Sequence, residues 1–180
     1  SPGADRRLVS DVARATQRLR RMDLAKPPGL AASYDWAAAL ATTSAGFAFS
    51  HGVPDNRVGR DAMLAHVAQL TAATNIPVSA DLENGYGDDP KTVAETVHLA
   101  AAAGVAGCSI EDSVNRPGEL VYEIGHATDR IRAAVEAARA MPFPFTLTAR
   151  AENFLVGRPD LKDTIRRLQA YQEAGADVLY

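Results

Sequence analysis

From residue 39 onward, short runs of the kind found in β-strands alternate with longer runs that have the period of an amphipathic helix. The expected strands are 39–44, 76–83, 107–112, 145–152 and 176–180. The expected helices are 57–74, 89–104, 127–140 and 161–175. Alternation of this kind, with short connections, predicts βαβ units built around a parallel sheet.

The side-chain pattern within the strands separates the two common parallel architectures. In an open, doubly wound sheet both faces are covered by helices, and the strands are apolar throughout. In the expected strand 145–152, polar Thr146, Thr148 and Arg150 alternate with apolar Leu147 and Ala149. One face therefore packs on helices while the other carries polar groups toward the carboxyl end. This pattern favours an α/β fold of the closed (β/α)8 TIM-barrel type.

The length of the chain limits how much of such a barrel it contains. A complete barrel takes roughly 250 residues, whereas this chain has 180. We expect one barrel domain over 1–180, with an N-terminal helix at 1–24 and about five strand–helix units over 39–180. The stretch 25–40 is too short for a further strand and helix. We therefore expect segments to be missing from the given sequence, both internally and after Tyr180.

Composition excludes several classes of partner. The formal net charge of −3 provides no basic surface for nucleic acid, and no apolar run reaches the length needed to cross a membrane. Cys108 is the single cysteine, so no internal disulfide forms and a cytoplasmic location is expected. The phase of the strand 107–112 places Cys108 against the helices, as a small buried apolar residue.

Acidic residues follow three successive strands. Asp81 and Glu83 are two positions apart at the end of one strand, so both carboxylates point to the same face. Glu111 ends the next strand, and Asp55 lies in the loop after the first. Like charges in one cavity repel unless a cation lies between them or one of them is protonated. Hard oxygen ligands without histidine or cysteine suit Mg²⁺, with Mn²⁺ as the second choice.

Two further features lie at the same end of the expected barrel. Arg150 ends the fourth strand and carries a guanidinium group suited to a carboxylate or phosphonate. A simpler interpretation is that Arg150 only neutralises Glu111 or Glu83. The segment Thr42–Gly46 ends the first strand with small and hydroxyl residues, whose backbone N–H groups could hold an anionic oxygen.

Taken in order, these segments resemble the isocitrate lyase/phosphoenolpyruvate mutase superfamily. The similarity runs from about Ala41 to Tyr180 and rests on the motifs Thr43-Ser44-Ala45-Gly46, Gly52-Val53-Pro54-Asp55, Ser79-Ala80-Asp81-Leu82-Glu83-Asn84-Gly85-Tyr86-Gly87, Gly104-Val105-Ala106-Gly107-Cys108-Ser109-Ile110-Glu111-Asp112 and Thr148-Ala149-Arg150-Ala151-Glu152. Each motif is loose, but the ordered set is specific.

The resemblance implies roles for individual residues. Ser44, with the backbone of Ala45 and Gly46, would bind the substrate carboxylate, and Arg150 would contact the substrate's anionic end. The Mg²⁺ shell would consist of Asp55, Asp81, Glu83 and Glu111, with Asp81 as the direct ligand. The residues expected to act in catalysis are Arg150, Glu111 and Asp55.

The resemblance also implies the chemistry and the assembly. A small anionic 2-oxo or 2-hydroxy acid would lose or rearrange a C–C or C–P bond through an enolate, with Mg²⁺ as Lewis acid. Such an enzyme would be a lyase or a phosphonomutase. Homo-oligomers, tetramers or dimers, are typical of this superfamily.

Departures from the family pattern narrow the choice of reaction. Glu83 stands where most members have an aspartate. The isocitrate and 2-methylisocitrate lyases have a Lys-x-Cys-Gly-His loop, but the corresponding stretch Ser113–His126 has neither cysteine nor lysine. We therefore predict that the protein is not an isocitrate lyase. Asn115 could take the place of the asparagine in the mutases' gating loop and bind substrate.

Several activities stay open on the sequence alone: carboxyphosphonoenolpyruvate phosphonomutase-like, oxaloacetate decarboxylase- or lyase-like, and phosphonopyruvate hydrolase activity. Two other classes also remain. One is a metal-dependent aldolase-type barrel that shares the carboxylates. The other is a non-catalytic relative that binds metabolites, suggested by Glu83 and by the absence of the cysteine loop.

Overall fold

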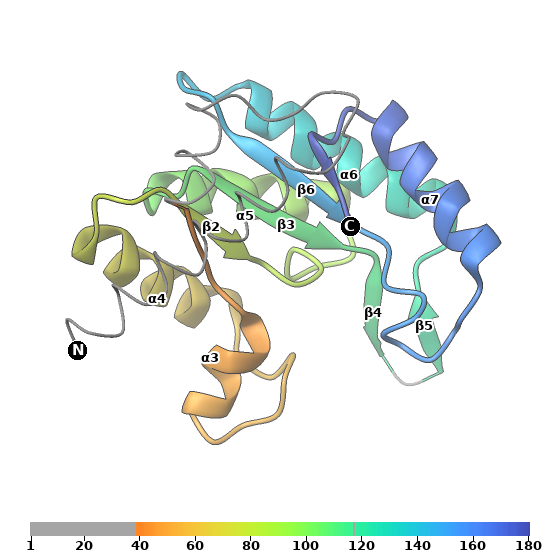
Figure 1. Cartoon of the computed structure of the whole chain (residues 1–180), viewed down its shortest axis with the longest axis horizontal. Helices are drawn as coiled ribbons and strands as arrows, with labels where there is room; N and C mark the ends of the chain where they lie inside the picture. Colours follow the sequence, from red (N-terminus) through yellow and green to blue (C-terminus); the bar gives the residue numbers. More distant parts are fainter. Residues whose placement is uncertain (1–38, 117) are drawn as a thin grey trace, which may run out of the picture. The chain divides into compact units, whose positions relative to one another are not determined.

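The computed structural model describes residues 39–116 and 118–180 (Figure 1). Contacts divide the chain into two units, Ser1–Leu40 and Ala41–Tyr180. The strands and helices described below belong to the second unit, except that Leu40, the first residue of the first strand, belongs to the first unit. The helix expected over 1–24 lies outside the described residues.

A five-stranded sheet has the strand order β1-β2-β3-β6-β7. These strands are β1 (Leu40–Ala41), β2 (Val78–Asp81), β3 (Gly107–Glu111), β6 (Thr146–Arg150) and β7 (Val178–Leu179). From β2 to β7 each neighbouring pair is parallel. The spatial order follows the chain order without the reversal of a doubly wound sheet, as in a barrel. The α/β barrel-type fold is therefore confirmed, and the described residues form part of such a barrel.

Four longer helices lie in the connections between the described strands: α4 (Arg60–Ala73), α5 (Pro90–Ala102), α6 (Ile124–Arg139) and α7 (Leu161–Glu173). Neighbours along the chain pack together, and each helix also contacts a strand next to it, α4 with β2 and α5 with β3. In Figure 1, α5, α6 and α7 lie along the same face of the sheet. Asp89 caps α5 by accepting a hydrogen bond from Lys91 N, and Pro90 opens the helix as predicted.

The two faces of the sheet differ as the strand pattern predicts. The helix-facing side chains Ala80, Cys108, Ile110 and Leu147 are almost fully buried. Each large apolar side chain buried there contributes roughly 1.5–3 kcal/mol. The alternate residues, such as Ser109, are only half-buried and lie on the opposite face. That face therefore carries the polar groups to the carboxyl ends of the strands.

Two elements at the carboxyl end of the sheet differ from the sequence prediction. The first strand was expected to reach Ser44, but it ends at Ala41, and Ser44 instead begins a short helix, α3 (Ser44–Ser50). The segment after β3, expected to be a loop, forms an antiparallel hairpin of β4 (Ser113–Arg116) and β5 (Glu119–Val121). No helix within the described part of the chain is long and apolar enough to cross a membrane.

Candidate active site

A cavity of about 510 Å³ opens at the carboxyl ends of the strands. Its lining consists of Thr42, Thr43, Ser44, Ala45, Asp55, Asn56, Asp81, Glu111, Ser113, Val114, Arg150, Glu152, Leu155 and Val156. Four of these side chains are carboxylates, and among the described lining residues Arg150 is the only cation. Barrel enzymes place their active sites at this end of the sheet. We therefore treat this cavity as the candidate active site.

Asp81 ends β2 and joins the cavity wall to helix α3. Its Oδ2 accepts hydrogen bonds from Ser44 N at 3.0 Å and from Ser44 Oγ at 3.1 Å. The carboxylate therefore faces the N-terminus of α3, where the backbone N–H groups favour negative charge. Asp81 N in turn donates to Thr42 Oγ1. These bonds hold the last residue of β2 in place.

The predicted anion-binding segment, Ser44 to Gly46, is partly engaged within the protein. Ser44 donates both of its hydrogen bonds to Asp81, and Gly46 N donates to Thr43 Oγ1 at 3.3 Å. Ser44 and Ala45 line the cavity, whereas Gly46 is not among its lining residues. Substrate binding at this segment stays a prediction, and it requires Ser44 to exchange its contacts with Asp81.

Glu83 lies close to the other carboxylates but faces a different cavity. Its side chain is 3% exposed and lines a neighbouring cavity of about 520 Å³, rather than the one that contains Asp81. Burial, followed by the charges of Asp55, Glu111 and Asp81, raises the pKa of Glu83 to about 8. The four predicted carboxylates therefore form one electrostatic cluster that spans two adjoining cavities.

The backbone around Glu83 has an unusual conformation. Glu83 and Tyr86 have φ angles of 51° and 61°, and Gly85 between them has a φ of 80°. The left-handed region is costly for residues other than glycine and is found where surrounding structure enforces it. The buried Arg130 of α6 holds this turn in place, because its Nη2 donates hydrogen bonds to the carbonyls of Asn84 and Gly87.

Arg150 lies between three carboxylates. Its Nε donates to Glu152 Oε1 at 2.6 Å, while Nη1 lies 3.6 Å from Asp81 Oδ1 and Nη2 lies 3.6 Å from Glu111 Oε2. Glu111 and Arg150 are partners in the β3–β6 register, so the sheet itself brings them together. Arg150 therefore neutralises Glu111, as the simpler interpretation of the sequence expected, and it also neutralises Asp81 and Glu152.

Glu111 and Asp55 complete the predicted cluster. Burial raises the pKa of Glu111 to about 7, partly offset by a hydrogen bond from Ser113 Oγ at 2.6 Å and reinforced by Glu152. Asp55 lies in the loop between α3 and α4, lines the cavity and accepts a hydrogen bond from the backbone N of Asn56. Glu111 thus ends its strand as predicted, while helix α3 separates Asp55 from the first strand, and the roles of both residues stay predictions.

Asn115 belongs to β4, whose residues Ser113 and Val114 line the cavity. A role for Asn115 in substrate binding stays a prediction. The sequence reasoning missed Glu152 as a site residue, although the alternation that selected Arg150 puts Glu152 on the same face. It also missed the apolar wall formed by Leu155 and Val156, for which the sequence carries no distinct signal.

The donor set of the cluster is compatible with Mg²⁺. All four candidate ligands are carboxylates, and their mutual repulsion favours a bound cation. In residues 39–116 and 118–180, no three His, Cys, Asp or Glu side chains converge closely enough to ligate one ion directly. Because Mg²⁺ keeps several waters and binds one or two carboxylates directly, a cluster spread in this way suits it.

Fold and site together define a portion of a parallel α/β barrel with an acidic, arginine-containing cavity at the carboxyl ends of its strands. Residues 12–180 match the family model described as "Phosphoenolpyruvate phosphomutase". The chain therefore belongs to the phosphoenolpyruvate phosphomutase family, within the isocitrate lyase/phosphoenolpyruvate mutase superfamily.

Individual relatives agree with this assignment. The chain is 36% identical over 138 residues to 2-methylisocitrate lyase of Escherichia coli (strain K12), a match that covers 73% of this chain and 45% of the relative. The crystal structure of a Burkholderia cenocepacia J2315 protein described as a lyase/mutase is 55% identical, with a TM-score of 0.78, and the match covers 96% of this chain and 65% of that one. The chain thus spans about half of the curated relative's length.

A third relative was solved with ligands. The structure of a phosphonopyruvate hydrolase in complex with oxalate and Mg²⁺ is 27% identical, with a TM-score of 0.73. The match covers 79% of this chain and 50% of that one.

Proposed function

We propose that the protein catalyses Mg²⁺-dependent cleavage or rearrangement of a C–C or C–P bond in a small 2-oxo or 2-hydroxy acid, through an enolate. The observation that carries the proposal is the cluster of Asp55, Asp81, Glu83 and Glu111, whose charges act on one another next to Arg150. The phosphonopyruvate hydrolase relative, solved with oxalate and Mg²⁺, supports the same chemistry.

The four carboxylates have distinct tasks in this proposal. Asp81 would hold Mg²⁺ directly, while Asp55, Glu83 and Glu111 would hold it through water. When bound, Mg²⁺ stabilises the negative charge that develops on the substrate oxygens. Because the pKa values of Glu83 and Glu111 are raised in the metal-free protein, a bound cation would favour loss of their protons.

Arg150 and the start of α3 bind the substrate. The guanidinium contacts the anionic end of the acid, and Glu152 holds its Nε so that the outer nitrogens face the cavity. The N-terminus of α3, with Ser44 and Ala45, accepts the substrate carboxylate. Val114, Leu155 and Val156 supply the apolar part of the wall and limit access of water to an enolate.

The choice among reactions depends on the hairpin. The stretch Ser113–His126, which forms β4 and β5, has no cysteine and no lysine to act as the acid or base of an isocitrate-type lyase. We therefore expect no glyoxylate from isocitrate. Decarboxylase, phosphonopyruvate hydrolase, phosphonomutase and other C–C lyase activities fit the described residues better.

A coupled assay for pyruvate release tests the proposal. The full protein is assayed with oxaloacetate, 2-methylisocitrate, dimethylmalate and phosphonopyruvate, with Mg²⁺ or with EDTA. We expect Mg²⁺-dependent release from one of them and a loss of at least about 100-fold in Asp81→Ala and Asp81→Asn, since a ligand contributes at least as much as its outer partners. The control is Asp129→Asn, which removes an exposed carboxylate paired with Arg132.

The opposite outcome identifies the alternatives. A folded protein that binds Mg²⁺ but releases no pyruvate from any of the four acids contradicts bond cleavage to pyruvate, and leaves mutase chemistry or a non-catalytic metabolite-binding role. Turnover that is unchanged by EDTA and by Asp81→Asn contradicts the metal-dependent mechanism itself.

A further inference from the structure

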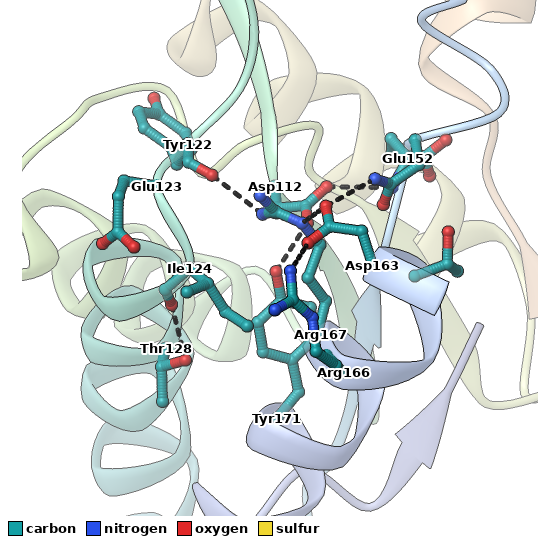
Figure 2. A network of polar contacts seen from close by, with 12 residues as sticks. Asp112, Tyr122, Glu123, Ile124, Thr128, Glu152, Asp163, Arg166, Arg167 and Tyr171 are labelled. Atoms are coloured by element: carbon teal, nitrogen blue, oxygen red, sulfur yellow. Dashed lines mark hydrogen bonds and ion pairs between the residues drawn. The ribbon is translucent and has the colours of Figure 1, made fainter. Parts of the chain in front are cut away.

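A buried polar network lies behind the candidate active site (Figure 2). Its centre is Asp112, the residue that follows Glu111. The side chain of Asp112 is buried, and the residue is 2% exposed. Asp112 Oδ2 accepts hydrogen bonds from two residues of α7, Arg167 Nη1 at 3.1 Å and Tyr171 Oη at 2.5 Å. Asp112 therefore links the end of β3 to the helix behind the sheet.

The α7 residues of the network are also hydrogen-bonded to other buried groups. Arg167 Nε donates to Asp163 Oδ2 at 2.8 Å, and Arg167 Nη1 also donates to the carbonyl of Tyr122 at 2.8 Å. Asp163 accepts a further bond from Asn153 Nδ2 at 2.9 Å. The hydrogen bond from Arg167 holds the pKa of Asp163 well below its ordinary value, so its charge is retained despite burial.

The other oxygen of Asp112 points toward the active site. Oδ1 accepts a hydrogen bond from the backbone N of Glu152 at 2.8 Å, and the backbone N of Asp112 donates to the carbonyl of Arg150 at 3.2 Å. Glu152 in turn accepts from Arg150 Nε. Asp112 thus holds the chain at Arg150 and at Glu152, the residue that orients the guanidinium.

Stability alone does not account for such an arrangement. Removing two or more charges from water costs so much that well-packed apolar residues stabilise a core as well or better. What the hydrogen bonds add is direction, because both oxygens of Asp112 and Oδ2 of Asp163 have buried donors. Active sites need such fixed geometry, since small displacements of a binding group weaken its contacts.

We propose that Asp112, held by Arg167 and Tyr171, is a positioning residue that fixes the orientation of Arg150 and Glu152 toward the anionic end of the substrate. The proposal rests on the substrate-binding role of Arg150 given above. Under this proposal α7 affects substrate affinity, although none of its residues lines the cavity.

The test uses Tyr171→Phe, which removes one hydroxyl group from Asp112 and keeps the buried ring. Binding of oxalate to the full protein in the presence of Mg²⁺ is measured by calorimetry at a temperature where the variant is fully folded. We expect about 10-fold weaker binding, at the low end of the range for loss of an outer hydrogen-bonding partner. The matched control is Arg166→Gln on the same helix, whose exposed side chain contacts only the other oxygen of Asp163. Its oxalate affinity should be that of the unsubstituted protein.

A purely structural role gives a different result. In that case Tyr171→Phe lowers the Tm, but the folded variant binds oxalate as tightly as the unsubstituted protein, and the proposal is overturned.

A second readout does not depend on oxalate binding. The Arg150 Nε–H resonance, assigned by its loss in Arg150→Lys, should exchange faster with water in Tyr171→Phe and at the original rate in Arg166→Gln. Unchanged exchange in Tyr171→Phe would overturn the positioning role. If the unsubstituted protein does not bind oxalate, the proposed function fails, while this resonance still decides the role of Asp112.

Discussion

At the scale of single residues, Glu83 is the group whose surroundings least favour its charge. It is buried, three other carboxylates lie within electrostatic range, and its backbone is left-handed. This conformation and this burial cost free energy, and residues that carry such a cost are common at functional sites. The protonation state of Glu83 should therefore be measurable in the stability of the metal-free protein.

We predict that the metal-free protein loses stability as the pH rises. The pKa of Glu83 is about 8 in the folded state against 4.5 ordinarily, so between these values the folded protein keeps a proton that the unfolded chain has lost. This stabilisation is fully present below about pH 4.5 and disappears as the pH passes 8. At about 1.4 kcal/mol per pKa unit, a shift of this size corresponds to roughly 5 kcal/mol, or about 10–20 °C in Tm.

Thermal unfolding in EDTA from pH 5 to pH 8.5 measures this effect. Glu83→Gln should flatten the decline, and Mg²⁺ added at pH 8 should raise the Tm of the unsubstituted protein but raise that of the variant less. An equally steep decline in Glu83→Gln would show that Glu83 is not the titrating group.

The sequence could identify single site residues where strand alternation applied. Asp81, Glu111 and Arg150 all end strands, and a period of two fixes the side to which they point. Glu83 follows the end of β2 in a turn with a positive φ, so the same period does not place it, and it faces the neighbouring cavity. The contacts of Ser44 with Asp81 depend on how α3 lies, which no local pattern encodes.

At the scale of secondary-structure elements, α6 supports the turn that carries Glu83. Arg130 is 1% exposed, donates to the carbonyls of Asn84 and Gly87, and lies with its guanidinium carbon 4.0 Å from the centre of the Tyr122 ring. Helix α6, on the outer side of the sheet, therefore fixes the turn that follows the carboxyl end of β2.

We expect Arg130→Met, which keeps much of the volume, to destabilise the protein by about 1–3 kcal/mol, because two carbonyls lose their donor. It should also weaken Mg²⁺ binding through the turn. Arg132→Met removes an exposed arginine from the same helix and should change stability by no more than about 0.5 kcal/mol. Urea unfolding and Mg²⁺ titration of both variants measure the difference. Equal effects of the two substitutions would contradict the supporting role of Arg130.

The helices α5 and α6 could be predicted because their apolar stripes face the core; Val93, Val97, Ile131 and Ala134 are all buried. For α7 the limits of the helix were predicted well, but its apolar residues Leu161 and Ile165 are exposed. Tyr171, which belongs to the same predicted stripe, is buried, together with Asp163 and Arg167 of a second, polar stripe. Periodicity alone cannot decide between two such stripes.

The short elements α3 and β4–β5 were not predicted for a related reason. α3 has seven residues and each hairpin strand has three or four, so neither is long enough to show a period. Their structure is set by contacts with the ends of the strands, such as those of Ser44 with Asp81 and of Ser113 with Glu111. Of these elements, α3 and β4 line the cavity.

At the scale of the whole molecule, the barrel-type arrangement explains why distant segments converge. Strands added in chain order bring the ends of β1, β2, β3 and β6 to one edge. The polar inner face and the helix-covered outer face are both consequences of the period-two pattern, so the fold class could be predicted from the sequence. Substrate choice could not, because it depends on the hairpin and on the cavity wall.

The site assignment is tested most directly by a crystal structure of the full protein with Mg²⁺ and oxalate. We predict one Mg²⁺ ion with Asp81 as its direct protein ligand, waters that contact Asp55, Glu83 and Glu111, and a carboxylate of oxalate next to Arg150 or the N-terminus of α3. A metal bound away from Asp81, or oxalate bound outside this cavity, would contradict the proposed roles of these residues.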